Sequence, residues 1–203
     1  EPADFRGQLQ IQNPLLVVDQ KQRDATLEEL EIEQTEKPVL VICPGAEFGP
    51  SKQWPADYFT EVASRMLEVG WDVWVIGSQK DQVIGRSIEV MTQSACRDLT
   101  GKTTLDQAVD LISLSSVVVS NDSGLMHVAA ALQRPQIALF GSSDAKHTPP
   151  LNPFARVMAR SMDCRPCMAR ECPEGHLNCL RGIMPDQVID EILSVAAEYA
   201  VAS

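Results

Sequence analysis

Residues 39–45 read Val-Leu-Val-Ile-Cys-Pro-Gly, a continuous apolar run that stops at a proline and a glycine. Similar apolar runs return later in the chain. A run that is apolar on both faces is typical of a parallel strand covered on both sides. We therefore predict strands over 39–43, 72–76, 116–120 and 136–140, a further one over 156–159 and a short one over 15–18.

The segments between these runs carry the helical spacing of apolar residues. Helices are predicted over 25–34, 58–69, 82–96, 104–114, 124–132 and 186–200. Thr26 would cap the first helix, because Glu29 follows three residues later and completes a capping box. Strands that alternate with helices predict an α/β fold, here a Rossmann-like parallel sheet with helices on both faces.

Composition and pattern divide the chain into two segments. Residues 1–37 are acidic and weakly patterned, and we expect a linker or entry segment there. Residues 38–203 form the predicted domain, with a cysteine-rich loop inserted at 164–179 and a closing helix at 186–200. No apolar run approaches the ~20 residues of a membrane span, so no transmembrane segment is expected.

The balance of charges narrows the choice of partners. With 17 basic and 28 acidic residues, the formal net charge is −11. We therefore expect no nucleic acid partner, because binding a phosphate backbone requires clustered Lys and Arg. A small anionic ligand remains compatible with this charge, since one Lys and a helix N-terminus suffice to hold a phosphate.

The candidate site lies in the loops that follow the predicted strands, because ligands bind at the carboxyl ends of strands in open parallel sheets. These loops are 44–52, 77–81, 121–127 and 141–148. Lys52 ends the first loop, just before a helix. It either meets a phosphate as a point charge or is an ordinary surface lysine beside a turn.

The third of these loops leads from a strand into a helix and reads Ser-Asn-Asp-Ser-Gly-Leu-Met-His over residues 120–127. Asp122 or Ser123 would cap that helix, and Gly124 lets a ligand approach the backbone closely. The free N–H groups at the helix start make an anion site. Asp122 either accepts hydrogen bonds from N–H groups or sugar hydroxyls, or is only a cap. His127 either contacts the ligand or only packs.

Three stretches together resemble a known family. They are Cys-Pro-Gly-Ala-Glu-Phe-Gly-Pro-Ser-Lys-Gln-Trp-Pro (43–55), Leu-Thr-Gly-Lys-Thr-Thr-Leu (99–105) and Ser-Asn-Asp-Ser-Gly-Leu-Met-His-Val-Ala-Ala-Ala (120–131). Over residues 38–200 the chain resembles glycosyltransferase family 9, the heptosyltransferases of lipopolysaccharide core assembly. The first stretch looks most like the branch that adds the second heptose of the inner core.

The resemblance implies a GT-B fold, in which two Rossmann-like halves face each other across a cleft. This chain would be the C-terminal half, which binds the donor ADP-heptose and requires no cofactor. Transfer would invert the anomeric carbon, with a general base, an Asp, on the other half, which also meets the lipopolysaccharide inner-core acceptor. A cytoplasmic protein is expected, and peripheral association with the inner face of the inner membrane is compatible with that role.

The resemblance also implies roles for individual residues. Lys52 would contact the diphosphate or the heptose and Asp122 the heptose hydroxyls, and these two are the catalytic candidates. The backbone N–H groups of Gly124 and Leu125 would meet the phosphates, and His127 would line the same pocket. The remaining donor-binding candidates are Glu47, Ser51, Ser78 in the loop that holds the ribose in some relatives, Thr103 near the adenine, and Ser123.

Four cysteines cluster near the end of the chain, with the spacing Cys164-x2-Cys167-x4-Cys172-x6-Cys179. Such a set is a credible group of zinc ligands. A redox-labile loop or disulfides are the alternatives. Two other functions also stay open: a different nucleotide-sugar transferase or epimerase on the same fold, and a noncatalytic zinc-binding interaction module organised by the cysteines.

Overall fold

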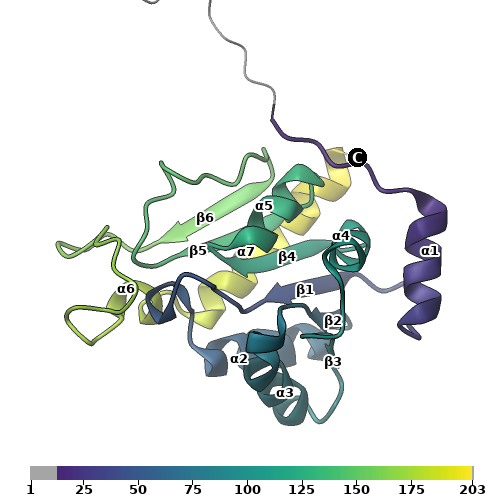
Figure 1. Cartoon of the computed structure of the whole chain (residues 1–203), viewed down its shortest axis with the longest axis horizontal. Helices are drawn as coiled ribbons and strands as arrows, with labels where there is room; N and C mark the ends of the chain where they lie inside the picture. Colours follow the sequence, from purple (N-terminus) through teal and green to yellow (C-terminus); the bar gives the residue numbers. More distant parts are fainter. Residues whose placement is uncertain (1–12, 203) are drawn as a thin grey trace, which may run out of the picture.

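The computed structural model describes residues 13–202, built around a six-stranded parallel sheet (Figure 1). The strands are β1 (Val39–Cys43), β2 (Asp72–Val75), β3 (Arg97–Asp98), β4 (Val117–Asn121), β5 (Gln136–Phe140) and β6 (Ala155–Ala159). Their order in the sheet is β3-β2-β1-β4-β5-β6, and every pairing is parallel. The order reverses between β1 and β4, which makes the carboxyl ends of these two strands the topological switch point of a Rossmann-like sheet.

Burial explains which strands could be predicted. Every residue of β1, β4 and β5 is buried, and all but Ser120, Asn121 and Gln136 are apolar, so these strands carry apolar side chains on both faces. Val41 of β1, for example, pairs with Trp74 on one side and Val118 on the other. The outermost strands differ: β6 is half-exposed, and β3 has only Arg97 and Asp98. No apolar run marks β3, and for that reason it was not predicted.

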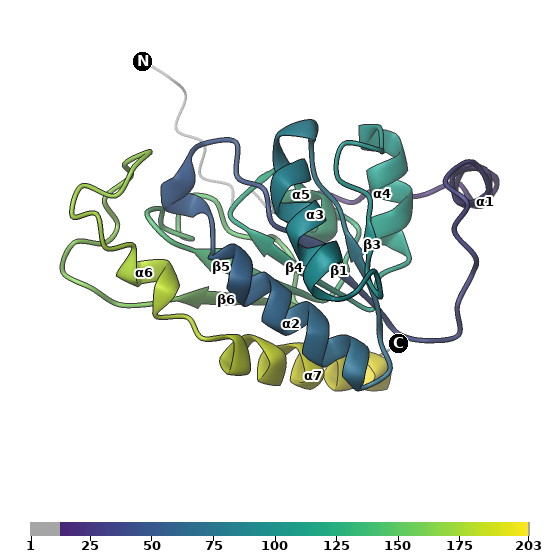
Figure 2. The ribbon, with the colours of Figure 1, turned by 90° about the horizontal axis from the view of Figure 1, so that it is seen from below.

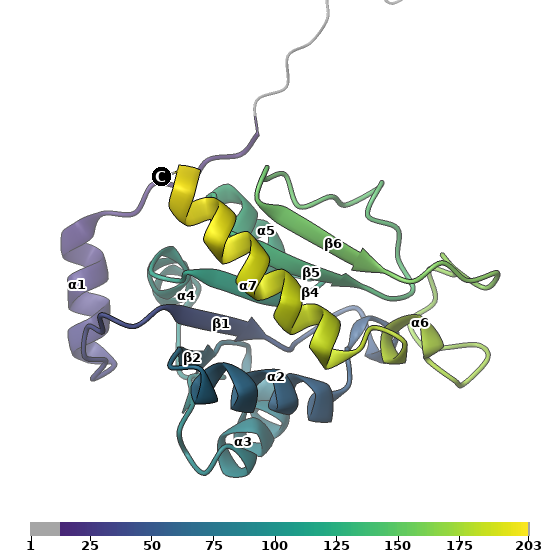
Figure 3. The same cartoon turned by 180° about the vertical axis from the view of Figure 1, so that it is seen from behind.

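Helices cover both faces of the sheet, which confirms the predicted α/β class. One face carries α2 (Ala56–Glu68), α3 (Gln82–Met91) and α7 (Pro185–Ala202), with α2 and α7 packed side by side (Figures 2 and 3). The other carries α4 (Leu105–Ser113) and α5 (Gly124–Ala131). Three short helices are η1 (Pro50–Lys52), η2 (Gln79–Asp81) and α6 (Asn178–Arg181). Within residues 13–202, none of the helices combines the length and apolarity that a bilayer crossing requires.

The core forms two layers, one on each side of the sheet. Phe59 and Met66 of α2 and Ile192 of α7 are fully buried against one face. Leu111 and Ile112 of α4 are fully buried against the other. Burying a side chain of this size stabilises the fold by roughly 1.5–3 kcal/mol. The sheet is therefore a rigid platform for the loops at its carboxyl end.

The N-terminal helix was placed wrongly from the sequence. Helix α1 spans Gln20–Glu29 and begins at Asp19, whose Oδ1 accepts a hydrogen bond from the Gln22 N–H at 3.0 Å. Thr26 lies inside the helix, not at its cap, and its hydroxyl donates to Asp110 Oδ2 of α4 at 2.7 Å. The capping-box pattern gave a wrong prediction because the Thr26 hydroxyl bonds to Asp110 of α4 and not to a backbone N–H group at a helix start.

A predicted strand and a predicted helix end were also wrong. Residues 15–18 form no strand; Leu16 only donates its N–H to the Ala131 carbonyl. The helix predicted over 82–96 ends at Met91, since Gln93 and Ser94 adopt left-handed backbone angles with φ of 55° and 59°. The predicted entry segment 1–37 is described only from residue 13, and its boundary stays a prediction.

We predict that Thr26→Val lowers the free energy of unfolding by about 1–3 kcal/mol, because it leaves a buried carboxylate oxygen of Asp110 without its donor. Urea unfolding monitored by circular dichroism measures the change. The matched control is Thr60→Val, since the Thr60 hydroxyl only bonds the Ala56 carbonyl within α2. Equal losses in the two variants would show that the α1–α4 contact contributes nothing of its own.

Candidate functional site

The loop after β1 is fixed to the end of β4 by one buried side chain, Asn121. Its Nδ2 donates to the Pro44 carbonyl at 2.7 Å, and its Oδ1 accepts the Trp54 N–H at 3.1 Å. Asn121 has no exposed surface. The amide therefore spans the switch point and holds both ends of the loop that carries Lys52.

Trp54 anchors the far end of the same loop in the core. Its indole N–H donates to the Ile183 carbonyl at 3.0 Å, and its ring meets Phe59 edge-on at 4.8 Å between centroids. The side chain is 1% exposed. Pro50–Lys52 forms a single 3-10 turn just before it, so Lys52 is positioned by rigid structure on both sides.

Lys52 and Asp122 form an ion pair across the switch point. Lys52 Nζ lies 2.5 Å from Asp122 Oδ2, and the two side chains are 16% and 4% exposed. Ser143 donates to the same Oδ2 at 2.5 Å, and Thr148 lies 3.4 Å from Oδ1. Three loops, after β1, β4 and β5, thus converge on one carboxylate, as expected for the carboxyl end of the sheet.

The first turn of α5 lies directly after this carboxylate and has no side-chain cap. Ser123 occupies the N-cap position, but its hydroxyl pairs with that of Ser120 at 3.2 Å. The expected capping by Asp122 or Ser123 was therefore wrong, because both side chains bond elsewhere. A Cβ added at Gly124 would meet nothing within 4 Å, so its backbone faces open space. Uncapped N–H groups at a helix start bind anions.

The loop after β2 is tied to the loop after β1. Asp81 Oδ2 accepts from the Ser78 N–H at 2.7 Å and from the Ser78 hydroxyl at 2.8 Å. A Cβ at Gly45 would lie 2.5 Å from that same oxygen, so any larger residue there would displace the Asp81 carboxylate. On the outer side Lys80 pairs with Glu47, and this hydrogen bond lowers the pKa of the Glu47 carboxyl. Both Ser78 and Glu47 are thus engaged within the protein.

The remaining predicted donor contacts have varied surroundings. Ser51 is buried, donates to the Ala169 carbonyl and lies 2.9 Å from the Ser142 hydroxyl, so its side chain is engaged within the protein. Thr103 is half-buried just ahead of α4, and Leu125 is half-buried on α5. His127 is exposed in the first turns of α5. Contacts of these residues with a ligand stay predictions.

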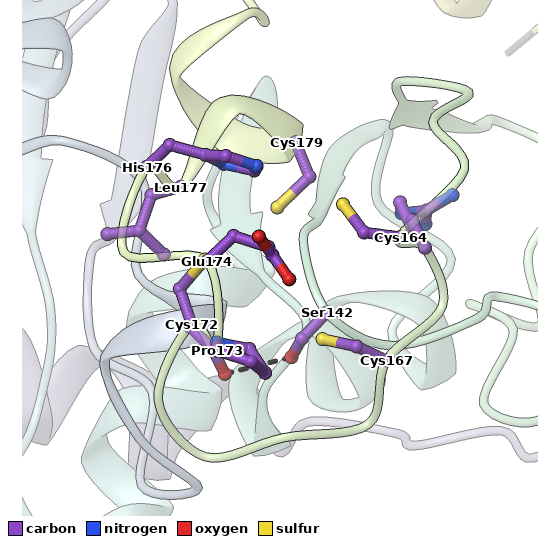
Figure 4. A pocket seen from close by; sticks show the side chains of 11 residues that line it. Ser142, Cys164, Cys167, Cys172, Pro173, Glu174, His176, Leu177 and Cys179 are labelled. Carbon is purple, nitrogen blue, oxygen red and sulfur yellow. Dashed lines mark hydrogen bonds between the residues drawn. The ribbon is translucent and has the colours of Figure 1, made fainter.

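The four clustered cysteines line one cavity of about 240 Å³ together with Glu174 and His176 (Figure 4). All four thiols are free. Throughout the described range, 13–202, no three or more His, Cys, Asp or Glu side chains are grouped as metal ligands. The zinc set expected at Cys164, Cys167, Cys172 and Cys179 stays a prediction. Cys179 lies in α6, and Cys172 lies in the preceding loop, where backbone N–H groups, that of Leu177 above all, lower the pKa of its thiol.

Several residues of the site were missed from the sequence. Asn121 and Asp81 position the loops, while Ser143 and Thr148 surround the Asp122 carboxylate. The sequence could place all four near the site, because they lie in the predicted loops after the strands or at the edges of those loops. It could not predict their individual roles, because these roles depend on contacts between segments far apart in the chain.

Known proteins are similar to this chain over most of its length. A family model described as glycosyltransferase family 9 (heptosyltransferase) matches residues 7–178. Lipopolysaccharide heptosyltransferase 2 of Escherichia coli K12 is 40% identical over 183 residues, 88% of this chain and 52% of the relative. Lipooligosaccharide heptosyltransferase 2 of Haemophilus ducreyi is 41% identical over 169 residues, 79% of this chain and 48% of the relative.

A solved structure gives the same result. The structure of E. coli ADP-heptose lps heptosyltransferase II superposes with a TM-score of 0.81 at 38% identity, covering 92% of this chain and 54% of that one. The chain thus spans about half the length of the curated relatives it matches.

We predict that Lys52→Met lowers the free energy of unfolding by about 3 kcal/mol, since it leaves the buried Asp122 carboxylate without its cation. The matched control is Lys80→Met, because the Lys80–Glu47 pair is solvent-exposed and such pairs contribute little. Urea unfolding of both variants measures the difference. If Lys80→Met lowers the free energy of unfolding as much as Lys52→Met does, burial of the Lys52–Asp122 pair adds nothing to its contribution to stability.

Proposed function

Because the chain belongs to glycosyltransferase family 9, we propose that it binds ADP-heptose for transfer of the heptose to the inner core of lipopolysaccharide. The observation that carries this proposal is the Lys52–Asp122 pair at the switch point, beside the uncapped first turn of α5. One cation, one carboxylate and free backbone N–H groups at this place suit a sugar diphosphate.

The donor would be held by two kinds of group. The diphosphate would lie between Lys52 Nζ and the N–H groups of Gly124 and Leu125, because these offer the positive charge near the sheet end. The heptose hydroxyls would donate to the Asp122 carboxylate, which Ser143 and Thr148 keep in place. The acidic chain needs no wider basic patch for this, since the positive groups are local.

Lys52 would also take part in the reaction. As the anomeric carbon is inverted, the departing ADP gains negative charge, and a cation with fixed N–H groups stabilises that charge without metal. A general base must deprotonate the acceptor hydroxyl. We assign that base, and the acceptor site, to the other half of a GT-B transferase, of which this chain would be the donor-binding half.

The place of action follows from the acceptor. Lipopolysaccharide precursors are lipid-anchored, so the transferase would meet its acceptor at a membrane face. A cytoplasmic enzyme in peripheral contact with the inner membrane stays our prediction. Two alternative functions are distinguished by the tests below: a transferase or epimerase for a different nucleotide sugar, and a zinc-binding module without catalysis.

We predict that the chain binds ADP about tenfold or more tightly than UDP or GDP, a difference of ~1.4 kcal/mol. Isothermal titration calorimetry with the three nucleotides measures it. Preference for UDP or GDP would contradict the heptose donor and favour another nucleotide sugar. One equivalent of zinc by elemental analysis, with no nucleotide bound, would favour the noncatalytic module.

Lys52→Met should weaken ADP binding roughly 10- to 100-fold, because a charge-assisted hydrogen bond contributes ~1.5–3 kcal/mol. The titration is made at a temperature where the variant is folded. Lys37→Met is the control, since Lys37 precedes β1 at the amino end of the sheet and pairs with Asp72 at 3.3 Å. Unchanged ADP affinity in Lys52→Met would remove Lys52 from the diphosphate site.

A further inference from the structure

Three successive backbone carbonyls of the loop after β5 accept hydrogen bonds from one short segment of the cysteine-rich loop. Arg165 donates from Nε to the Gly141 carbonyl at 2.6 Å and from Nη2 to the Ser143 carbonyl at 2.9 Å. Between these two, the Met168 N–H donates to the Ser142 carbonyl at 2.9 Å. The planar guanidinium therefore spans the three residues and fixes the path of their backbone.

The Arg165 side chain makes a firm connection to this loop. Both of its hydrogen bonds are charge-assisted, and such bonds are stronger than bonds between neutral groups. The residue is also half-buried, so water competes less for the two carbonyls than it would at an exposed position. We therefore expect the loop after β5 to loosen when the guanidinium is removed.

Ser143 carries this connection into the candidate site. Its hydroxyl donates to Asp122 Oδ2 at 2.5 Å, and the residue is 2% exposed. The carbonyl of the same residue is one of the two that Arg165 holds. A single residue thus links the guanidinium to the Asp122 carboxylate.

The two oxygens of the Asp122 carboxylate have different surroundings. Oδ2 is bonded to both Lys52 and Ser143, at 2.5 Å each. Oδ1 lies 3.4 Å from the hydroxyl of Thr148, a residue in the exposed part of the loop after β5. Oδ2 therefore has its partners inside the protein, and Oδ1 is the oxygen with capacity left for a ligand. Which oxygen is presented depends on the Ser143 hydroxyl.

We propose that Arg165 is a positioning residue for sugar binding: it holds the backbone of Ser143, whose hydroxyl orients the Asp122 carboxylate toward the sugar of an ADP-sugar. The inference rests on the proposed function, because it takes the sugar hydroxyls as ligands of Asp122. Arg165 touches no ligand in this arrangement and acts only through Ser143.

The separate attachment of Lys52 provides a readout for the test. Asn121 and Trp54 hold the turn that carries Lys52, so the diphosphate contact depends less on Arg165 than the sugar contact does. Arg165→Met should weaken ADP-heptose binding about three- to tenfold, as expected for the loss of one hydrogen bond, and ADP binding less than about twofold.

Isothermal titration calorimetry of the full chain with ADP and with ADP-heptose measures the two affinities, at a temperature where the variant is folded. The quantity compared is the ratio of the two dissociation constants. A merely structural role of Arg165 would reduce the fraction of folded protein, which weakens both ligands alike and leaves this ratio unchanged.

Further variants trace the route from Arg165 to the site. Ser143→Ala should change the ratio in the same direction, and adding Arg165→Met to it should cause no further change, because the two residues act in one chain of contacts. Arg165→Lys keeps the charge but cannot span two carbonyls in one plane, so it should behave like Arg165→Met. Arg156→Met is the control, since Arg156 lies near the amino end of β6 and pairs with Glu191 and Glu198.

Hydrogen exchange of the unliganded chain separates this inference from the proposed function. The amides of residues 140–148 should exchange faster in Arg165→Met than in the parent chain, whatever the chain binds. If the parent chain bound neither ADP nor ADP-heptose, the proposed function and the sugar as ligand would be overturned together. Faster exchange would then still show that Arg165 fixes the loop after β5.

Three results would overturn the proposal in a parent chain that binds both ligands. A ratio that Arg165→Met leaves unchanged would remove Arg165 from sugar binding. Full recovery of the ratio in Arg165→Lys would assign the effect to charge and not to the hold on two carbonyls. Additive losses in the double variant would show that Arg165 does not act through Ser143.

Discussion

The amide of Asn121 is the interaction on which the carboxyl end of the sheet depends. A doubly wound sheet has a crevice beyond the carboxyl ends of the strands where its strand order reverses, and here the reversal lies between the paired strands β1 and β4. At this point Asn121 bonds to both ends of the loop after β1. Together with the buried Trp54 side chain and the hydrogen bond from the Ser142 N–H to the Ser51 carbonyl, this amide fixes the turn that holds Lys52 beside Asp122.

The Lys52–Asp122 pair gives the resting site a particular electrostatic character. With its carboxylate buried and its lysine bonded to it, the pair is locally neutral before any ligand arrives. A diphosphate must therefore share the lysine with Asp122, and not simply enter a positive pocket. The aromatic ring of Phe48 beneath the ammonium offers a second partner during that exchange.

Most of the sheet and the location of the site could be predicted from the sequence, for physical reasons. Buried parallel strands must be apolar on both faces, which made β1, β4 and β5 visible, and loops after such strands gather at one edge. Lys52 and Asp122 were expected in one site on that basis, and Lys52 Nζ lies 2.5 Å from Asp122 Oδ2. The two-residue strand β3 and the true start of α1 carried no such pattern.

Two cap assignments failed for the same reason. Asp122 and Thr26 were both considered as helix caps, the usual use of such residues at helix starts. In the structure Asp122 and Thr26 bond to residues distant in sequence, Lys52 and Asp110. The preference of such residues for helix caps reflects contacts between near neighbours in sequence, so it does not predict a partner that only the tertiary fold brings close. The same reason hid Ser143 and Thr148.

The half-exposed strand β6 has a consequence for how these molecules behave in concentrated solution. An outermost strand of five residues offers unpaired backbone groups along one side, to which a like strand could add. Arg156 is the second residue of this strand and forms ion pairs with Glu191 and Glu198 of α7. Charged side chains on an outermost strand disfavour edge-to-edge pairing, so Arg156 lowers the tendency of two copies to associate through β6.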